Sequence, residues 1–262
     1  MLEGATRGVS PLPSRRDLVL RDVDGPNAGV LAPARSRIGL LGGFQLEVEG
    51  RSVSPPVHVQ RLLAFLALQG RRLQRAYVAG CLWLDLSQER ANGCLRTTLW
   101  RMGRLHFTLV QASSTHLALD PSVVVDAREL EVCADRALHA HAPPSADDIE
   151  QLARARELMP DWYDDWVLTE RERIRQLRLL ALEAASDKLI QSRRFADASI
   201  TALAALETDP YRESACRLLI RSYVGTGNVA EALHQVSVFC ARLQREGLSP
   251  SSHMQELVRR IA

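Results

Sequence analysis

Four arginines, an asparagine and two threonines lie within the fifteen residues from Arg90 to Arg104, and the acidic residue beside them is Glu89. Arginine forms two hydrogen bonds with guanine, asparagine does likewise with adenine, and threonine contacts the thymine methyl group. Arginine also binds phosphate, which positions a protein on a duplex without reading its sequence. These residue types predict nucleic-acid recognition, with base contacts from Asn92, Arg96 and Thr97 and mostly phosphate contacts from Arg90, Arg101 and Arg104.

A helix from Ser87 to about Leu105 is predicted to position these side chains. At about 100° per residue, one sector of the helix is apolar and consists of Ala91, Leu95, Thr98, Leu99 and Met102. The arginines, Thr97 and Trp100 spread over the opposite half. Ser87 suits the N-cap position, but Arg90 stands where a glutamate would complete a capping box.

The polar half of this helix has two interpretations, a face that is only solvated and a face that fits a nucleic-acid groove. A solvated face usually pairs its cations with acids four residues away, and this one does not. Trp100 lies near the middle of the polar half, where an exposed indole needs something to cover it. Both features favour the groove. Trp100 is therefore counted among the DNA-binding residues, with cover by a neighbouring β-hairpin as the structural alternative.

The segments around this helix predict a winged helix-turn-helix. GFQLEVEGRSV alternates apolar and polar residues about a turn at Glu49-Gly50, which indicates a β-hairpin. VHVQRLLAFLALQG predicts a helix that stops at Gly70, and QRAYVAGCLW predicts a short second helix. After the basic helix, FTLVQASSTHLALD predicts two strands around a polar turn. In this turn, the wing, contacts to the DNA backbone or minor groove are expected from Ser113, Ser114, Thr115 and His116.

From Asp126 onward the pattern is helical, with an exposed connection at HAHAPPSADD and a helix near Ile149. Residues 185–198 and 219–232 align with a shift of 34 positions, which superposes Ala198 on Ala232. A helical repeat of this length with small residues at fixed places is typical of tetratricopeptide repeats. Two repeats alone are marginally stable, so helices before 185 and after 245 are expected to complete the stack.

The predicted fold class is mainly α with small β elements, in three segments. Residues 1–36 are expected to be a disordered N-terminal arm, either a dispensable tail or one that orders on a partner. Residues 37–124 form a winged helix-turn-helix of the response-regulator type, and residues 125–262 form an all-α domain of tetratricopeptide-like repeats. Between Arg37 and Val124 ten arginines stand against five acidic residues, while the rest of the chain is slightly acidic. A polyanionic partner is therefore assigned to the winged helix.

Several other classes of protein are disfavoured. No run of eighteen apolar residues or signal-peptide core is present, so a cytoplasmic, nucleoid-associated protein is expected. The five cysteines contain no Cys-x-x-Cys pair, and His139 and His141 lack further metal ligands nearby, so no zinc site is expected. The single lysine, Lys188, has no P-loop glycines before it, and no nucleophile motif is found. We therefore expect no enzyme, no cofactor and no metal.

Three aromatic residues, Trp162, Tyr163 and Trp166, lie in the run DWYDDW before a predicted helix. They have two interpretations, an aromatic ligand pocket between the domains or a staple of the helical stack. The second is favoured, although a small-molecule effector site remains open.

The segments LLGGFQLEVEGRSV, RLLAFLALQGRRLQR, ERANGCLRTTLWRMGRL and LVQASSTHLALDPSVVVDAREL resemble the winged-helix half of the Streptomyces antibiotic regulatory proteins. LMPDWYDDWVLTERERIRQLRLLALEA and the repeats are similar to their bacterial transcriptional activation domain. The resemblance covers about residues 37 to 250. One departure is Gly103. Members of the family often read WRLRR where this chain reads WRMGR, so they carry an arginine at this position. Glycine weakens the helix end by about 1 kcal/mol relative to alanine.

The resemblance implies a pathway-specific transcriptional activator of a secondary-metabolite (antibiotic) gene cluster. Members bind tandem direct repeats in promoter DNA, often as head-to-tail pairs, so a homodimer is expected at least on DNA. They also contact RNA polymerase, and the corresponding polymerase-contact loop here consists of Trp83, Leu84, Asp85, Leu86 and Ser87. Two alternatives stay open: a repressor with the same DNA-binding domain, and a protein-interaction adaptor that uses the repeats.

Overall fold

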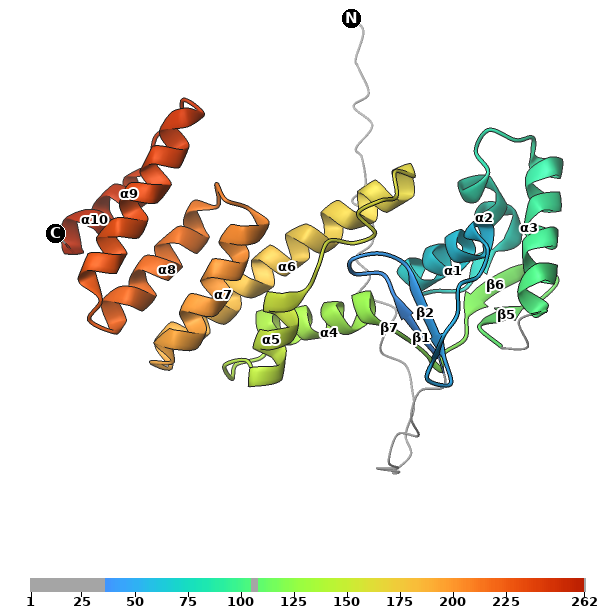
Figure 1. Cartoon of the computed structure of the whole chain (residues 1–262), viewed down its shortest axis with the longest axis horizontal. Coiled ribbons are helices and arrows are strands. Elements are labelled where there is room, and N and C mark those ends of the chain that lie inside the picture. The colour runs from blue at the N-terminus through green and yellow to red at the C-terminus, as the bar shows by residue number, and fades with distance from the viewer. Residues whose placement is uncertain (1–35, 105–107, 262) are drawn as a thin grey trace, which may run out of the picture. The chain divides into compact units, whose positions relative to one another are not determined.

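The computed structural model describes residues 36–104 and 108–261 (Figure 1). It begins with a four-stranded sheet in the order β3-β2-β1-β7, made of β1 (Ser36–Gly39), β2 (Gln45–Val48), β3 (Arg51–Ser52) and β7 (Val123–Val125). The predicted hairpin is β2–β3, and its turn places Glu49 and Gly50 at φ 51° and 75°. Strands β1 and β7 were not predicted, because each is too short to show an alternating pattern. The predicted N-terminal arm lies outside the described residues except for Ser36.

The helix-turn-helix follows as α1 (Val57–Gln69), α2 (Arg75–Leu82) and α3 (Gln88–Gly103). Every residue of α1 from Leu62 to Leu68 is buried, which is wider than the predicted stripe. The helix ends as predicted at Gly70, which has φ 64° and donates its N–H to the carbonyl of Leu66. Helix α3 ends at Gly103, and the predicted end at Leu105 lies outside the described residues.

The wing is a three-stranded sheet in the order β4-β6-β5. The two predicted strands are β5 (Val110–Ala112) and β6 (His116–Leu119). The third is β4 (Leu73–Gln74), which joins α1 to α2 and pairs Leu73 with Leu117. Because β4 belongs to the same sheet as the wing, it ties the wing to the start of α2.

Seven helices make up the second half of the described chain: α4 (Asp126–His139), α5 (Ala146–Arg154), α6 (Asp165–Gln191), α7 (Phe195–Thr208), α8 (Glu213–Gly225), α9 (Val229–Arg245) and α10 (Ser252–Ile261). The predicted repeat is confirmed, because the turn between α6 and α7 and the turn between α8 and α9 are 34 residues apart. Ala198 and Ala232 are both fully buried. A Cβ atom on Gly225 would lie 2.4 Å from the Phe195 ring, so this glycine permits the close approach of two helices.

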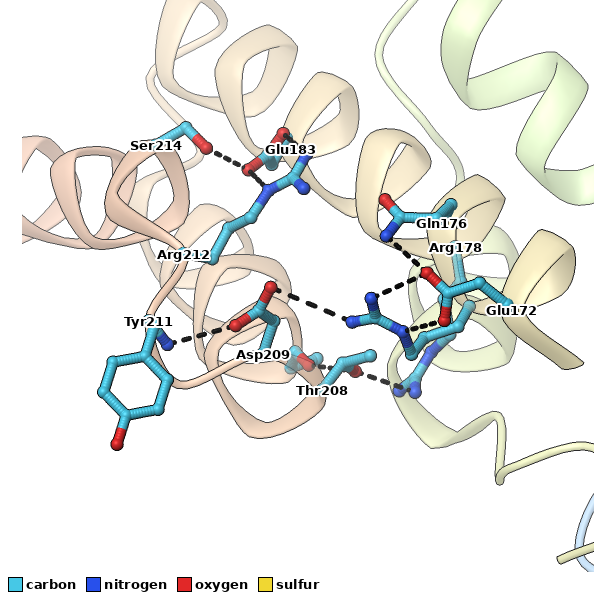
Figure 2. Close-up of polar contacts among 11 residues, drawn as sticks. Glu172, Gln176, Arg178, Glu183, Thr208, Asp209, Tyr211, Arg212 and Ser214 are labelled. Atoms are coloured by element: carbon cyan, nitrogen blue, oxygen red, sulfur yellow. Dashed lines mark hydrogen bonds and ion pairs between the residues drawn. The ribbon is translucent and has the colours of Figure 1, made fainter. Parts of the chain in front are cut away.

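Ion pairs also join successive repeats. Glu183 of α6 accepts hydrogen bonds from Arg212 at 2.8 and 3.0 Å and from the hydroxyl of Ser214 (Figure 2). Asp187 pairs with Arg221, its neighbour one repeat later, at 2.8 Å. The single lysine, Lys188, donates to the carbonyls of Ala137 and Ala140 and so stabilises the end of α4. None of the described helices is long and apolar enough to cross a membrane.

The aromatic run around the start of α6 packs on the winged helix. Trp166 meets the ring of Phe65 edge-on at 5.2 Å, and Trp162 stacks on Phe44 at 6.4 Å. We predicted that these tryptophans hold the helical repeats together, and this was wrong about their partners. Their aromatic partners are Phe65 in α1 and Phe44 beside β2. Tyr163 contributes little, because 76% of it is exposed. One cluster of buried apolar residues runs from Ile38 to Ala215 as a result.

Replacing Asp148 by asparagine is expected to destabilise the fold by about 1–3 kcal/mol at neutral pH. Asp148 is 8% exposed, forms a capping box with Ser145 and accepts hydrogen bonds from Arg136. Burial opposes ionisation of this carboxyl, but the hydrogen bonds from Arg136 and Ser145 outweigh it and lower the pKa. The stabilisation is therefore present above the unfolded-state pKa and is lost as pH falls through the lower folded-state pKa.

Urea unfolding of the wild type and Asp148→Asn at pH 7 and pH 3 measures this effect. The difference in the free energy of unfolding between the two proteins should be smaller at pH 3 than at pH 7. Asp147→Asn is the matched control, since Asp147 lies exposed in the same helical turn. An equal loss of unfolding free energy in Asp148→Asn and Asp147→Asn would contradict the role given to Asp148.

Candidate nucleic-acid interface

Helix α3 is held by its apolar side. Ala91, Leu95, Thr98 and Met102 are buried, and Leu99 packs against the same core. This confirms the predicted apolar sector. Ser87 occupies the N-cap position, but its side chain makes no capping hydrogen bond, and the helix starts without the expected side-chain cap. The rigidity of α3 therefore comes from packing, and its polar half faces away from the core.

A hollow of about 720 Å³ lies between the first half of α3 and the wing. Asn92 and Arg96 line it from α3, and Ser114, Thr115 and His116 line it from the wing. Figure 1 shows α3 beside β5 and β6. Two of the predicted base-contacting residues thus share one surface with three of the four predicted wing residues. The third predicted base-contacting residue, Thr97, is exposed but does not line this hollow.

The wing turn is built by hydrogen bonds around Ser113. The Ser113 hydroxyl accepts the backbone N–H of His116 at 3.0 Å, and Thr115 Oγ1 lies 2.8 Å from His116 Nδ1. Ser113 is half-buried, so it shapes the turn, while Ser114 and Thr115 are exposed. The turn is consequently an internally hydrogen-bonded projection beside α3.

Two arginines that sequence reasoning missed support this turn. Arg75 donates to the Ser113 carbonyl at 3.0 Å and also lines the hollow. Arg72 Nη2 lies 3.5 Å from the Ser113 hydroxyl. The basic run RRLQR at residues 71–75 is the sequence feature that could have indicated these two arginines. It was missed because these residues are far from the wing in sequence and meet it only through β4.

Arg90, Thr97 and Arg101 line a second hollow, of about 490 Å³, with Trp83 and Leu86 of the predicted polymerase-contact loop. Arg101 Nη1 lies 3.2 Å from Nε2 of His58. Burial and the positive charge of Arg101 lower the pKa of His58. The predicted DNA-binding residues therefore fall into two groups, one facing the wing and one facing the loop before α3.

The loop before α3 presents apolar side chains to solvent. Leu84 is 70% exposed and Leu86 is 38% exposed. Trp83 is half-buried and packs against the core, whereas Asp85 and Ser87 are exposed. The loop thus combines an anchored tryptophan with two accessible leucines.

Trp100 is 60% exposed, and the guanidinium carbon of Arg104 lies 4.3 Å from the centre of its ring. This is a cation–π contact between residues one helical turn apart. Arg104, predicted to bind phosphate, lies over the indole instead of extending away from it. The two side chains form a flat, positively charged surface near the end of α3.

The arginines of α3, and Arg104 directly after it, have no acidic partners in the described part of the chain. No carboxylate within those residues lies within 4.0 Å of a nitrogen of Arg90, Arg96, Arg101 or Arg104, whereas Arg212 and Arg221 in the helical repeats are paired. Within the same residues, no group of three or more histidine, cysteine or acidic side chains is arranged to hold a metal. An uncompensated positive surface attracts a polyanion.

Comparisons with known proteins agree with this architecture. The family model described as the bacterial transcriptional activator domain matches residues 125–262, more than half of the chain. The solved structure of Mycobacterium tuberculosis EmbR in complex with a low affinity phosphopeptide is similar in fold, with a TM-score of 0.67 at 20% sequence identity. The alignment covers 87% of this chain and 65% of that one. A search of curated proteins found no match.

The fold is therefore a winged helix-turn-helix followed by a helical domain, as predicted. The chain belongs to the bacterial transcriptional activator domain family, among regulators of the Streptomyces antibiotic regulatory protein type.

Proposed function

We propose that this protein is a sequence-specific DNA-binding activator of transcription. The observation that carries the proposal is the hollow between α3 and the wing, where Arg96 and Asn92 stand exposed or half-exposed opposite Thr115 and His116. A helix of this kind fits the major groove of B-form DNA, and a neighbouring β-hairpin reaches the adjacent backbone or minor groove. Arg96 and Asn92 read bases, and the wing fixes the position of the protein on the duplex.

The second group on α3 has a different role in this proposal. Arg90 and Arg101 bind phosphates at the edge of the groove, and Arg104 does so with its guanidinium resting on Trp100. Thr97 contacts a base next to that read by Arg96. The loop from Trp83 to Ser87 contacts RNA polymerase through the exposed leucines Leu84 and Leu86.

The regulated genes are proposed to be a secondary-metabolite gene cluster whose promoters contain tandem direct repeats. Two copies of the chain bind head to tail, one on each repeat, and so form a dimer at least on DNA. No enzymatic reaction or cofactor is part of this proposal. A repressor would use the same DNA contacts, and the position of the binding site relative to the promoter distinguishes the two.

Binding to DNA upstream of the neighbouring gene cluster tests the proposal. The affinity of the purified protein should fall steeply as salt rises, because each phosphate contact releases condensed counterions. A footprint should show repeats spaced about 10–11 base pairs apart, which places two copies on one side of the duplex. Affinity that does not change with salt would contradict the phosphate contacts.

One observation favours a second function, that of a protein-interaction adaptor. A hollow of about 610 Å³ lies between α6, α8 and α10, lined by apolar residues such as Leu180 and Leu257 and by charged residues such as Asp187 and Arg221. Helical repeats often bind partners along such a surface. For an adaptor, deletion of residues 126–262 would abolish activity while Arg96→Ala left it intact.

A further inference from the structure

Five arginines line a cavity of about 740 Å³ in the helical half of the chain. The cavity lies between the segment that follows α5, the middle of α6 and the end of α7, and its arginines are Arg154, Arg156, Arg171, Arg175 and Arg178. Two acidic residues, Glu157 and Glu207, also line it, which leaves an excess of three positive charges. Cavities of about 300–1,000 Å³ are typical of small-molecule sites.

Three of these arginines lie on the same face of α6. Arg171, Arg175 and Arg178 are separated by four and three residues, so they are neighbours along the helix surface. Like charges at this spacing repel one another. Arg175 is neutralised by Glu172 at 2.8 Å and faces Asp209 at 3.8 Å. Among the described residues, Arg171 and Arg178 have no carboxylate partner as close as the one that Arg175 has in Glu172.

Arg171 and Arg178 are held in place by neutral acceptors. Arg171 donates to the carbonyl oxygens of Leu158, Met159 and Trp162. It also lies 3.4 Å from a carboxylate oxygen of Glu157, which is mostly exposed. These bonds fix the Arg171 guanidinium at one end of the cavity.

Arg178 donates to the carbonyl oxygens of Leu152 and Ala153 at 2.8 Å each. It also donates to the hydroxyl of Thr208 at 2.9 Å (Figure 2). In the described ranges no carboxylate lies within ion-pair distance of it. Burial lowers the pKa of Arg178, and the nearby charge of Glu207 only partly opposes this. A partly buried charge without a close counter-charge is unfavourable, and an anion in the cavity would supply one.

Arg178 also retains unused donors. A guanidinium has five N–H groups, and three of those of Arg178 are used in the contacts above. Arg156 lines the same cavity, is exposed, and makes no ion pair with any residue in the described parts of the chain. Its aliphatic stem packs beside Gly42, where an added Cβ would lie 2.8 Å from Arg156 Cδ. Arg156 and Arg178 therefore both have donors that can bind an anion in this cavity.

We propose that this cavity binds a small anionic molecule whose carboxylate or phosphate groups pair with Arg156 and Arg178. Leu158 and Ile174, which also line the cavity, contact the apolar part of that molecule. This site is separate from α3 and the wing. The proposal therefore does not depend on DNA binding.

The wall of this cavity is connected to the winged helix by backbone hydrogen bonds. Gly42 donates its N–H to the carbonyl of Glu157 at 2.7 Å, and Met159 donates to Leu40 at 2.9 Å. Leu41 and Leu158 pair as an isolated β-bridge between these two bonds. A bound anion therefore stabilises a segment that is bonded directly to the end of β1.

Titration calorimetry of the full chain in phosphate-free buffer at constant ionic strength tests the proposal, with pyrophosphate and citrate as separate probes. At least one probe should bind and raise the melting temperature, and the tighter of the two tells whether the site prefers phosphate or carboxylate. Arg156→Gln and Arg178→Gln should each weaken binding about tenfold, because each removes a charged hydrogen bond. Arg245→Gln is the matched control, since Arg245 is exposed on α9 outside the cavity.

Circular dichroism establishes whether each variant folds. If Arg178→Gln fails to fold, Arg156→Gln decides the result, because Arg156 is exposed and its loss leaves no acceptor without a donor. The proposal is overturned if neither probe binds. It is equally overturned if Arg156→Gln binds the probes as tightly as Arg245→Gln. Binding would then depend only on the net charge of the protein and not on the arginines of this cavity.

Discussion

Replacing Arg96 by alanine is expected to lower the affinity of the protein for its promoter DNA by about tenfold to a hundredfold. Arg96 is exposed on α3, lines the hollow that faces the wing and has no acidic partner in the described chain. Its guanidinium is free to form two hydrogen bonds with a guanine, an interaction that contributes about 1–3 kcal/mol of discrimination between bases. Fluorescence anisotropy with labelled promoter duplex at one fixed salt concentration measures the change.

Two further variants separate base reading from simple charge. Arg96→Lys keeps the charge but loses the paired geometry, so it should retain binding to unrelated DNA while losing preference for the promoter. Arg245→Ala removes an exposed arginine from α9 and should leave the affinity unchanged. Equal affinities of Arg96→Ala and Arg245→Ala for the promoter would rule out the interface assigned to α3.

Replacing Phe65 by alanine is expected to reduce the free energy of unfolding by about 3–5 kcal/mol. Phe65 is 1% exposed in α1, and its ring meets Trp166 of α6 edge-on at 5.2 Å. Removal of the ring leaves a cavity where the winged helix packs on the helical half. Because one buried apolar cluster runs through the winged helix and the helical half, the loss of the Phe65 ring should lower the stability of both parts together.

Urea unfolding followed by tryptophan fluorescence and by far-ultraviolet circular dichroism measures this effect. Phe65→Leu is the control, since it keeps most of the buried volume and should cost less than about 1.5 kcal/mol. A cost below about 1 kcal/mol for Phe65→Ala would contradict the packing described here. An unchanged circular dichroism transition would show that the helical half does not depend on this contact.

Much of the secondary structure follows from local patterns. The apolar sector of α3 was predicted residue by residue, because packing on one side of a helix imposes a spacing that is visible in a short stretch of sequence. The 34-residue repeat was found in the same way, since its small residues recur wherever two helices pack closely. The ends of these elements were less exact, as at Gly103, because the end of a helix depends on its last few hydrogen bonds.

The elements that were missed are those with little local pattern. Strands β1, β4 and β7 have between two and four residues, and each is stabilised by a partner distant in sequence. The candidate DNA interface was found only in part for the same reason. Arg72 and Arg75 support the wing across about forty residues of chain, and that relation exists only once β4 has paired with β6.

The amino-acid sequence by itself determined the three helices of the helix-turn-helix, the apolar and basic sides of α3, the helical character of the second half and its repeat. The helices depend on residues within a few turns of one another, and the repeat shows because the same local pattern recurs 34 residues later. Only the tertiary structure decided that Arg96 and Asn92 share a hollow with the wing, that Trp166 packs on Phe65, and that five arginines surround one cavity. Those relations join residues that are distant along the chain, and the path of the loops together with the packing of the core sets their positions.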